Sequence, residues 1–277
     1  MIADPRFLGQ PPEFWANVKL ISQKANYTER GTGTIKQHSI HDIRNVFKTV
    51  NLKTTNLIGE NDQLTPFGIV LIDYFKYRAD VLNNFVKVNL MDAAEAKKTF
   101  EDLRAQLKPT CPLPMNKQKA AKQDYSFFTC IINTLIQHHL KGLDCNFDPK
   151  ELTSFTHDSF PVRTLSRRVD GTFPGTVDPK AIWEIKEYYY TTTFGSRVAD
   201  GVYETMLDGL ELIEVRKSLK LDVEHYLMID DYNTWWNMGR SYLCRMNDML
   251  HMGVVSEILF GREVLTRLPL IVANWIK

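Results

Sequence analysis

Cysteine is scarce in this sequence, and its few copies are not arranged for metal or disulfide chemistry. Of the 277 residues, only 4 are cysteines. None belongs to a C-x-x-C pair, and none lies near a histidine at the spacing typical of zinc ligands. We therefore expect neither a zinc site nor a disulfide framework, but buried or neutral thiols in a reducing compartment. The four are Cys111, Cys130, Cys145 and Cys244.

Long hydrophobic runs are also missing. No segment approaches the roughly 18 uninterrupted apolar residues of a membrane span, so we expect no membrane partner. Residues 1–10 contain no basic stretch followed by an apolar run and therefore do not look like a signal peptide. The expected location is the cytoplasm.

Neither charge sign predominates. The chain has 34 Lys and Arg against 33 Asp and Glu, a formal net charge of +1. A nucleic-acid-binding surface would therefore have to be local, on one domain or one face. The sequence otherwise has an ordinary globular composition, with 44% hydrophobic and 24% charged residues, enough to bury a core in one large or two modest domains.

Residues 1 to about 107 are expected to form a mostly helical domain. Apolar residues recur at helical spacing over 13–24 and 40–50, and Thr65-Pro66 begins a further helix as N-cap and first helical residue. The segment 57–64, just before it, has the pattern of a short hairpin. The order helix, helix, hairpin, helix is that of a winged helix. A helical bundle that serves only dimerisation is the open alternative.

In a winged helix, the helix over 40–50 would be the recognition helix. Arg44 and Lys48 lie four residues apart on one of its faces, partly opposite its apolar positions. We expect this polar face to contact bases of double-stranded DNA, and Lys36, just before it, to contact a phosphate. The competing hypothesis makes this half a dimerisation module and places recognition on the second half.

Residues 108–124 are expected to be a linker. They hold Pro109, Pro112 and Pro114, followed by a lysine-rich run that either touches phosphates or is simply solvated. The lysines of the run are Lys117, Lys119 and Lys122.

The pattern changes from Tyr125 onward. We therefore expect an α/β (α+β) fold over 125–277, with a small mixed β-sheet flanked by helices. In order, the pattern predicts a helix over 126–140, strands over 152–155, 161–169 and 181–190, a helix over 196–219, a strand over 223–229 and a helical region from Trp235.

The strand over 181–190 carries the most informative residues. Successive side chains of a strand alternate between its faces, so Glu184 and Lys186 point to one side and Trp183 and Ile185 to the other. Two charges inside an apolar strand need a reason, because a buried charge without a partner is costly. A metal ion bound by Glu184, with Lys186 beside it, supplies that reason.

An aspartate upstream would complete the metal site. If a hairpin is centred near Val177, then Asp170 falls opposite Glu184, and such positions lie about 4.5–5.5 Å apart. Two carboxylates at that separation suit Mg²⁺, which prefers oxygen ligands. Asp178 is the rival, but it would reach the same ion only if the chain folded back within 179–182. We rank Asp170 first.

Asp170 followed by Glu184-Ile185-Lys186 resembles the D…(D/E)-X-K signature of the PD-(D/E)XK nucleases, and the order of elements from Tyr125 onward is similar too. The resemblance implies that Asp170 and Glu184 hold Mg²⁺ and that Lys186 positions or polarises the attacking water. Val169 stands where the family has a proline. The helix over 126–140 has no acid, although many members carry a glutamate there.

The loop between that strand and the next helix is a candidate DNA contact. It includes Thr193 and Arg197, with Ser196 as the expected N-cap. The free amides of a helix N-terminus attract phosphate, and an arginine adds a suitable charge. An ordinary strand-to-helix loop is the alternative.

The sequence therefore predicts an Mg²⁺-dependent DNA endonuclease of the type II restriction class. By resemblance, such enzymes commonly act as homodimers on palindromic double-stranded DNA. Two alternatives stay open: a structure-specific repair or recombination nuclease, and a non-catalytic winged-helix regulator whose second half is only a scaffold.

Overall fold

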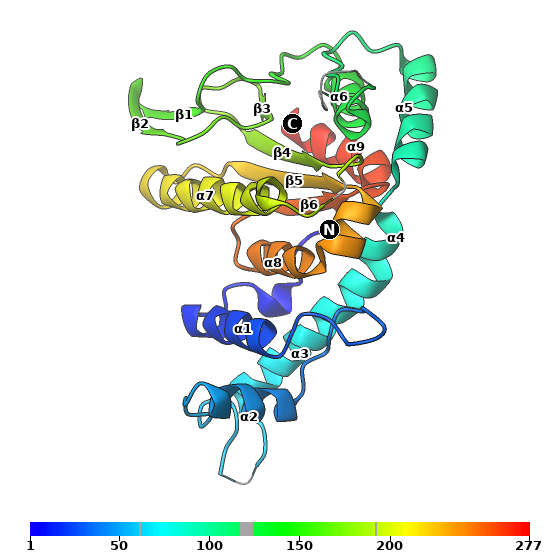
Figure 1. Cartoon of the computed structure of the whole chain (residues 1–277). Coiled ribbons are helices and arrows are strands. Elements are labelled where there is room, and N and C mark those ends of the chain that lie inside the picture. The colour runs from blue at the N-terminus through cyan, green and yellow to red at the C-terminus, as the bar shows by residue number, and fades with distance from the viewer. Residues whose placement is uncertain (61, 117–123, 192) are drawn as a thin grey trace. The chain divides into compact units, whose positions relative to one another are not determined.

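The chain divides into two compact units in a computed structural model (Figure 1). It describes residues 1–60, 62–116, 124–191 and 193–277, and of Arg197 only the backbone. The first, here called the sheet unit, comprises Met1–Ile2, Asn89–Met238 and Val254–Lys277. The second, the helical unit, comprises Ala3–Val88 and Gly239–Gly253.

A four-stranded mixed sheet forms the centre of the sheet unit. Its order is β3 (Gly171–Phe173), β4 (Ala181–Glu187), β5 (Glu224–Asp230) and β6 (Glu257–Phe260). β3 and β4 are antiparallel and joined by a hairpin, whereas β4, β5 and β6 run parallel and therefore need crossover connections. The expected mixed α and β fold with a small mixed sheet is confirmed. A restriction-endonuclease-like core stays a prediction.

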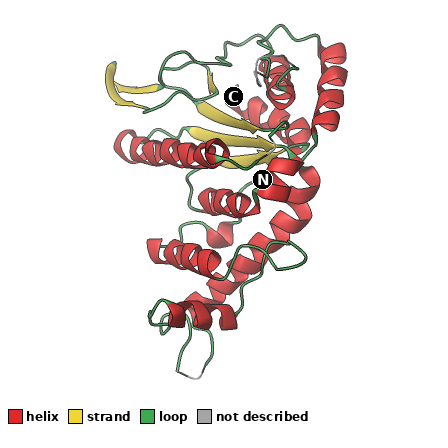
Figure 2. Ribbon diagram, viewed as in Figure 1, coloured by secondary structure: helices red, strands yellow, loops and turns green. Residues whose placement is uncertain are grey.

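One face of the sheet is covered by α6 (Phe127–Leu140) and α9 (Glu263–Trp275), with α5 (Ala93–Leu107) packed on α6 (Figure 2). The inward side chains of β4 on this face include Trp183, which stacks on Trp275 with ring centroids 5.6 Å apart. α6 is buried on nearly all sides, and its sequence is accordingly mostly apolar.

The other face of the sheet is covered by α7 (Ser196–Leu219). Leu212 and Val215 of this helix pack with Ile182 of β4 in a separate apolar cluster. Gly209 lets the helix come close, because a Cβ at this position would lie 2.3 Å from the carbonyl oxygen of Val254. α7 is therefore fixed against the sheet at a defined depth.

Three expectations for this half need correction. The segments expected as strands over 152–155 and 161–169 instead form a separate two-stranded hairpin of β1 (Ser154–His157) and β2 (Phe160–Thr164). The pattern predicts only helix after Trp235, so β6 is a further correction. This region consists of η3 (Tyr232–Met238), α8 (Arg240–His251), β6 and α9.

The helical unit contains η1 (Pro5–Phe7), α1 (Pro12–Lys24), α2 (Ile40–Thr49) and α3 (Pro66–Asp80), together with α8. After α3 come η2 (Val81–Val86) and α4 (Lys87–Asn89). Thr65 caps α3 by accepting from the amide of Gly68, as expected, and Ser39 caps α2 in a capping box with Asp42. No helix among the described residues is long and apolar enough to cross a membrane.

Where a short hairpin was expected over 57–64, Ile58 and Leu64 form one antiparallel bridge, and residue 61 lies outside the described residues. The order helix, helix, hairpin, helix is therefore present, although a winged helix stays a prediction. The units part at Val88 and Asn89, earlier than the expected boundary near 107, so α5 belongs with the sheet. The lysines at 117, 119 and 122 lie outside the described residues.

A buried ion pair joins the two segments of the helical unit. The guanidinium of Arg78 on α3 donates to both carboxylate oxygens of Asp248 on α8, at 3.1 and 3.2 Å, and neither side chain is more than 5% exposed. Tyr74 donates to the same carboxylate at 2.6 Å, and Arg78 also donates to Ser22 at 2.8 Å. Asp248 stabilises the charge on Arg78 and raises the pKa of the guanidinium against the opposing effect of burial.

Removing the acid should leave a buried cation without compensation. We expect Asp248→Ala to lower the free energy of unfolding by about 3–5 kcal/mol, measured by urea denaturation. Asp73→Ala, which removes only the exposed pair with Lys76, should change it by no more than about 0.5 kcal/mol. Equal effects of the two substitutions would contradict the assigned role of the pair.

Candidate active site

The β3–β4 hairpin positions the carboxylates expected at the site. Gly171 pairs with Trp183 and Thr172 with Ile182, so the register continued by one residue places Asp170 opposite Glu184, as expected. Gly171 is required here because the ring of Trp183 lies over it, and a Cβ would come within 2.0 Å of that ring. The amide of Asp170 donates to the carbonyl of Trp183 at 3.1 Å.

The two candidate aspartates have different surroundings. The carboxylate of Asp170 accepts a hydrogen bond from the amide of Ile185 at 2.7 Å, which holds it against β4. Asp178 lies in the turn of the hairpin and accepts from the amide and hydroxyl of Thr156 in β1, at 2.7 and 2.5 Å. These bonds give Asp178 a structural role between the two hairpins and favour Asp170 as the functional acid.

Glu184 is fully buried and held by two cations. The amine of Lys186 lies 2.7 Å from its Oε2, which agrees with the expected shared face of the strand. Arg167 donates to both oxygens of Glu184, at 2.9 and 3.3 Å. Burial alone would raise the pKa of Glu184, but Lys186 and Arg167 hold it below its ordinary value. Glu184 is therefore ionised and covered.

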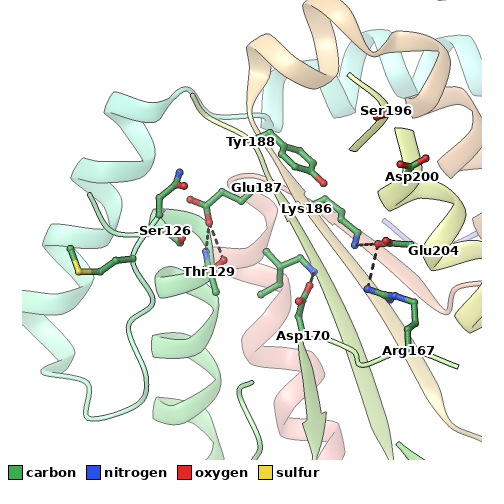
Figure 3. A pocket seen from close by; sticks show the side chains of 13 residues that line it. Ser126, Thr129, Arg167, Asp170, Lys186, Glu187, Tyr188, Ser196, Asp200 and Glu204 are labelled. Carbon is green, nitrogen blue, oxygen red and sulfur yellow. Dashed lines mark hydrogen bonds and ion pairs between the residues drawn. The ribbon is translucent and has the colours of Figure 1, made fainter. Parts of the chain in front are cut away.

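Two acids of α7 face the same cations. Arg167 donates to Asp208 at 2.6 Å and lies 3.4 Å from a carboxylate oxygen of Glu204. Lys186 lies 3.7 Å from the same oxygen of Glu204 (Figure 3). Asp208 is fully buried, and its Oδ1 has no hydrogen-bond partner among the described residues. Four carboxylates thus face two cations, an excess of negative charge.

Burial and this excess of negative charge raise the pKa values of two of the acids. Burial, reinforced by the charge of Glu184, raises the pKa of Asp170 to about 6 and that of Asp208 to about 7. The pKa of Lys186 lies above its ordinary value because Glu184 and Asp170 outweigh the effect of burial. A cation entering the site would stabilise the ionised form of both aspartates.

The site opens at the edge of β4. Because the pairing of β3 with β4 stops at Gly171 and Trp183, the C-terminal part of β4 has no described strand on the β3 side, and a pocket of about 610 Å³ lies there. Arg167, Asp170 and Lys186 point into this pocket from one side, and Asp200 and Glu204 of α7 from another (Figure 3). Glu184 is not among the lining residues, because the two cations cover it.

Another largely buried acid, Glu187, lies on the opposite wall of the pocket. Glu187 accepts from both the amide and the hydroxyl of Thr129 in the first turn of α6, at 3.0 and 2.9 Å. Burial raises its pKa to about 7, and its Oε1 has no partner among the described residues. The helix that lacks an acid of its own therefore binds one from β4.

The donors present suit Mg²⁺ in kind but are not assembled as a complete ligand set. Carboxylate oxygens are the ligands this ion prefers. However, the described part of the chain contains no group of three or more His, Cys, Asp or Glu side chains placed to hold a metal ion. A bound ion would therefore rely on Asp170 and Glu184, with the buried free oxygen of Asp208 nearby and water completing the shell.

The three residues predicted to contact DNA at the start of α7 have different positions in the structure. Ser196 is the first residue of the helix and lines the pocket, but the N-cap is Gly195, so the expected cap is wrong. Gly195 has no side chain that could accept from the first amides of the helix. Thr193 is exposed in the preceding bend, and the side chain of Arg197 lies outside the described residues.

In the helical unit, Arg44 and Lys48 lie together as expected. They line a second pocket of about 600 Å³ between α2 and the 57–64 hairpin, and Arg44 pairs with Asp62 at 2.7 Å. Lys36 is half-buried and bonded to Asp42 at 2.6 Å and to the carbonyl of Ala25. Its expected phosphate contact is therefore disfavoured, since its amine stabilises the start of α2.

Arg167, Asp208, Glu204 and Glu187 were not anticipated from the sequence. A signal for Asp208 existed, since it shares a helical face with Gly201, Thr205 and Leu212, which would place an acid toward the sheet. Nothing in the sequence pattern places Arg167, because it reaches the site from a loop.

Comparisons with known proteins agree in part with the division of the structure. Residues 91–275 match the family model described as Domain of unknown function (DUF7687), and residues 1–85 match Domain of unknown function (DUF7690). The chain belongs to the DUF7687 family, whose model spans the sheet unit and α8. The break between the two matches falls where the units part. No curated protein and no solved structure matches the chain.

The raised pKa of Asp208 predicts a measurable dependence of stability on pH. Because the folded state holds this proton more tightly than the unfolded state, stability should fall as pH rises from about 4 through about 7, by up to about 1.4 kcal/mol per pH unit. Asp208→Asn should remove this contribution, so the variant gains relative to wild type across that window. Urea denaturation at several pH values measures it, and parallel curves would contradict the assignment.

Proposed function

We propose that this protein is an Mg²⁺-dependent DNA endonuclease, and most specifically a type II restriction endonuclease. The observation that carries the proposal is the placement of Asp170 opposite Glu184, with the amine of Lys186 at 2.7 Å from Glu184, beside an open strand edge. A carboxylate pair with an adjacent lysine in a polar pocket is a site built for hydrolysis of a phosphodiester.

The roles of the chain's residues follow from their charges. Asp170 and Glu184 would hold the ion, since the register of the β3–β4 hairpin places them opposite each other. When bound, Mg²⁺ lowers the pKa of water and offsets charge on the phosphate. Lys186 is charged, points into the pocket and would orient the attacking water or the scissile phosphate. The amides at the start of α7, with Ser196, offer a place for a neighbouring phosphate.

The arrangement of elements supports the same proposal. α6, the β3–β4 hairpin, α7 and the parallel β5 follow one another around one mixed sheet, which is the order that the resemblance to PD-(D/E)XK nucleases implies. Double-stranded DNA is the proposed substrate, cut by a homodimer. Arg44 and Lys48 of the helical unit would contribute to recognition.

Arg167 blocks the acids of this site in this structure. Its guanidinium bonds to Glu184 and Asp208, so it occupies the place where a metal ion would meet these acids. We infer that Arg167 must leave Glu184 before the ion binds, and an approaching DNA phosphate is a suitable acceptor for it. In the absence of DNA, Arg167 would therefore compete with the ion.

Cleavage of a sequenced plasmid tests the function. Asp170→Asn and Glu184→Gln should each lower the Mg²⁺-dependent rate by at least about 100-fold, because the ion's contribution is several kcal/mol. Asp178→Asn, which alters an acid bonded to Thr156, serves as the matched control and should cut normally. Circular dichroism verifies folding.

The outcomes separate the alternatives. Full cleavage activity in Glu184→Gln would refute the nuclease proposal. Loss of cleavage in Asp178→Asn, with full activity in Asp170→Asn, would show that Asp178 is the metal ligand. Discrete fragments favour restriction, whereas cutting only at branches or ends favours a repair or recombination nuclease. Binding without cutting by the wild type favours a regulator.

The competition by Arg167 is tested without any cleavage. Arg167→Gln should lower the Kd for Mg²⁺, measured by calorimetry on the DNA-free protein, by about tenfold, because a charge-assisted bond to Glu184 no longer has to be broken. Arg168→Gln, at the exposed neighbouring position, is the control and should leave the Kd unchanged. Unchanged or weaker binding in Arg167→Gln would refute the competition.

A further inference from the structure

The outer face of α7 carries a stripe of exposed residues. Its members recur at alternating intervals of three and four residues along the 24-residue helix, and all are exposed. Tyr203, Leu207 and Leu210 in its middle are 53%, 43% and 48% exposed. The α7 stripe consists of Asp200, Tyr203, Leu207, Leu210, Glu214 and Lys217.

This stripe is distinct from the face that packs on the sheet. Thr205, Asp208 and Leu212 on the inner face are fully buried, and Gly209 fits closely against Val254. Single exposed apolar residues are common on protein surfaces. Tyr203, Leu207 and Leu210, however, occupy consecutive positions of a repeat with alternating intervals of three and four residues. Residues with this spacing form the seam along which two helices pack knobs into holes.

The charges at the two ends of the stripe specify the partner. Asp200 lies near the N-terminal end and Lys217 near the C-terminal end. If a second α7 runs antiparallel with Leu207 facing Leu210, then Asp200 faces Lys217 and Tyr203 faces Glu214. A parallel pairing would instead set each charge against its own copy. The stripe is therefore complementary to itself in the antiparallel direction only.

We propose that the α7 stripe is the contact between two copies of this chain, with their α7 helices packed antiparallel. The stripe spans about 26 Å, at 1.5 Å rise per residue. A seam of that length is smaller than the standard interface, so association in the micromolar range is expected from it alone. Glu214 would accept from Tyr203 of the second copy while it keeps its bond to Arg163, at 3.1 Å.

The pairing has a consequence for the pocket at the edge of β4. Asp200 belongs both to the stripe and to the lining of that pocket. An antiparallel contact would thus bring Lys217 of the second copy to the rim of the pocket and add a positive charge there. The contact itself is argued from α7 alone and does not depend on the proposed function.

Sedimentation equilibrium over about 1–100 µM protein tests the contact. The wild type should show a reversible monomer–dimer equilibrium. Leu207→Glu and Leu210→Glu should each raise the dissociation constant by about 100-fold or more, because each change removes two buried leucines from the dimer. Leu270→Glu, at a 57% exposed position on α9, is the matched control and should associate like the wild type.

A charge exchange tests the antiparallel direction. Lys217→Glu alone should weaken association by about tenfold, because it sets two acids against each other twice in the dimer. Adding Asp200→Lys should restore it to within about threefold of the wild type. A wild type that stays monomeric at about 100 µM, or leucine variants that still associate, would overturn the contact. Loss without rescue in the exchange would overturn the antiparallel register.

Discussion

The burial of one negative charge, that of Glu184, is the constraint on which the sheet unit depends. A carboxylate inside a sheet is tolerated only when it is paired and hydrogen-bonded. Lys186 meets this need from the same strand, and Arg167 meets it from a loop. Each cation in turn requires acids of its own, which α7 supplies through Glu204 and Asp208. These ion pairs thus connect β4 to α7, in addition to the apolar packing of Leu212 and Val215.

The shortness of β3 turns that buried cluster into an accessible one. β3 pairs with β4 over only three residues, and Asp170 immediately precedes the first of them. A longer strand would have covered the edge beside Ile185 and Glu187 and closed the pocket. The same three residues also set the register that brings Asp170 across from Glu184, and Gly171 makes this possible by leaving room for the ring of Trp183.

Much of the local structure could be predicted from the sequence, since it depends on local signals. The bounds of α7 and the cap of α3 followed from helical spacing and capping residues. The facing of Asp170 and Glu184 followed from the turn residues between them, because a hairpin's centre fixes its register. The shared face of Glu184 and Lys186 followed from the alternation of a strand.

The rest depends on long-range packing, which no local pattern reports. Arg167 reaches Glu184 from a loop. Lys36 is bonded to Asp42, whereas the sequence suggested that it was free to contact a phosphate. β6 is a short apolar run that a helix would explain equally well. The placement of α8 with the first 88 residues could not be foreseen, because it depends on long-range contacts such as the pair of Arg78 and Asp248.

That connection has a consequence for how the chain folds as it is synthesised. The helical unit needs two segments that lie at opposite ends of the sequence, Ala3–Val88 and Gly239–Gly253. While the intervening residues are being made, at about 5–20 residues per second, α3 has left the ribosome but lacks α8. Until Asp248 has been synthesised, the guanidinium of Arg78 has to remain hydrated. The helical unit therefore cannot be completed before Gly253 has been synthesised, and the sheet unit follows last, because it also needs Val254–Lys277.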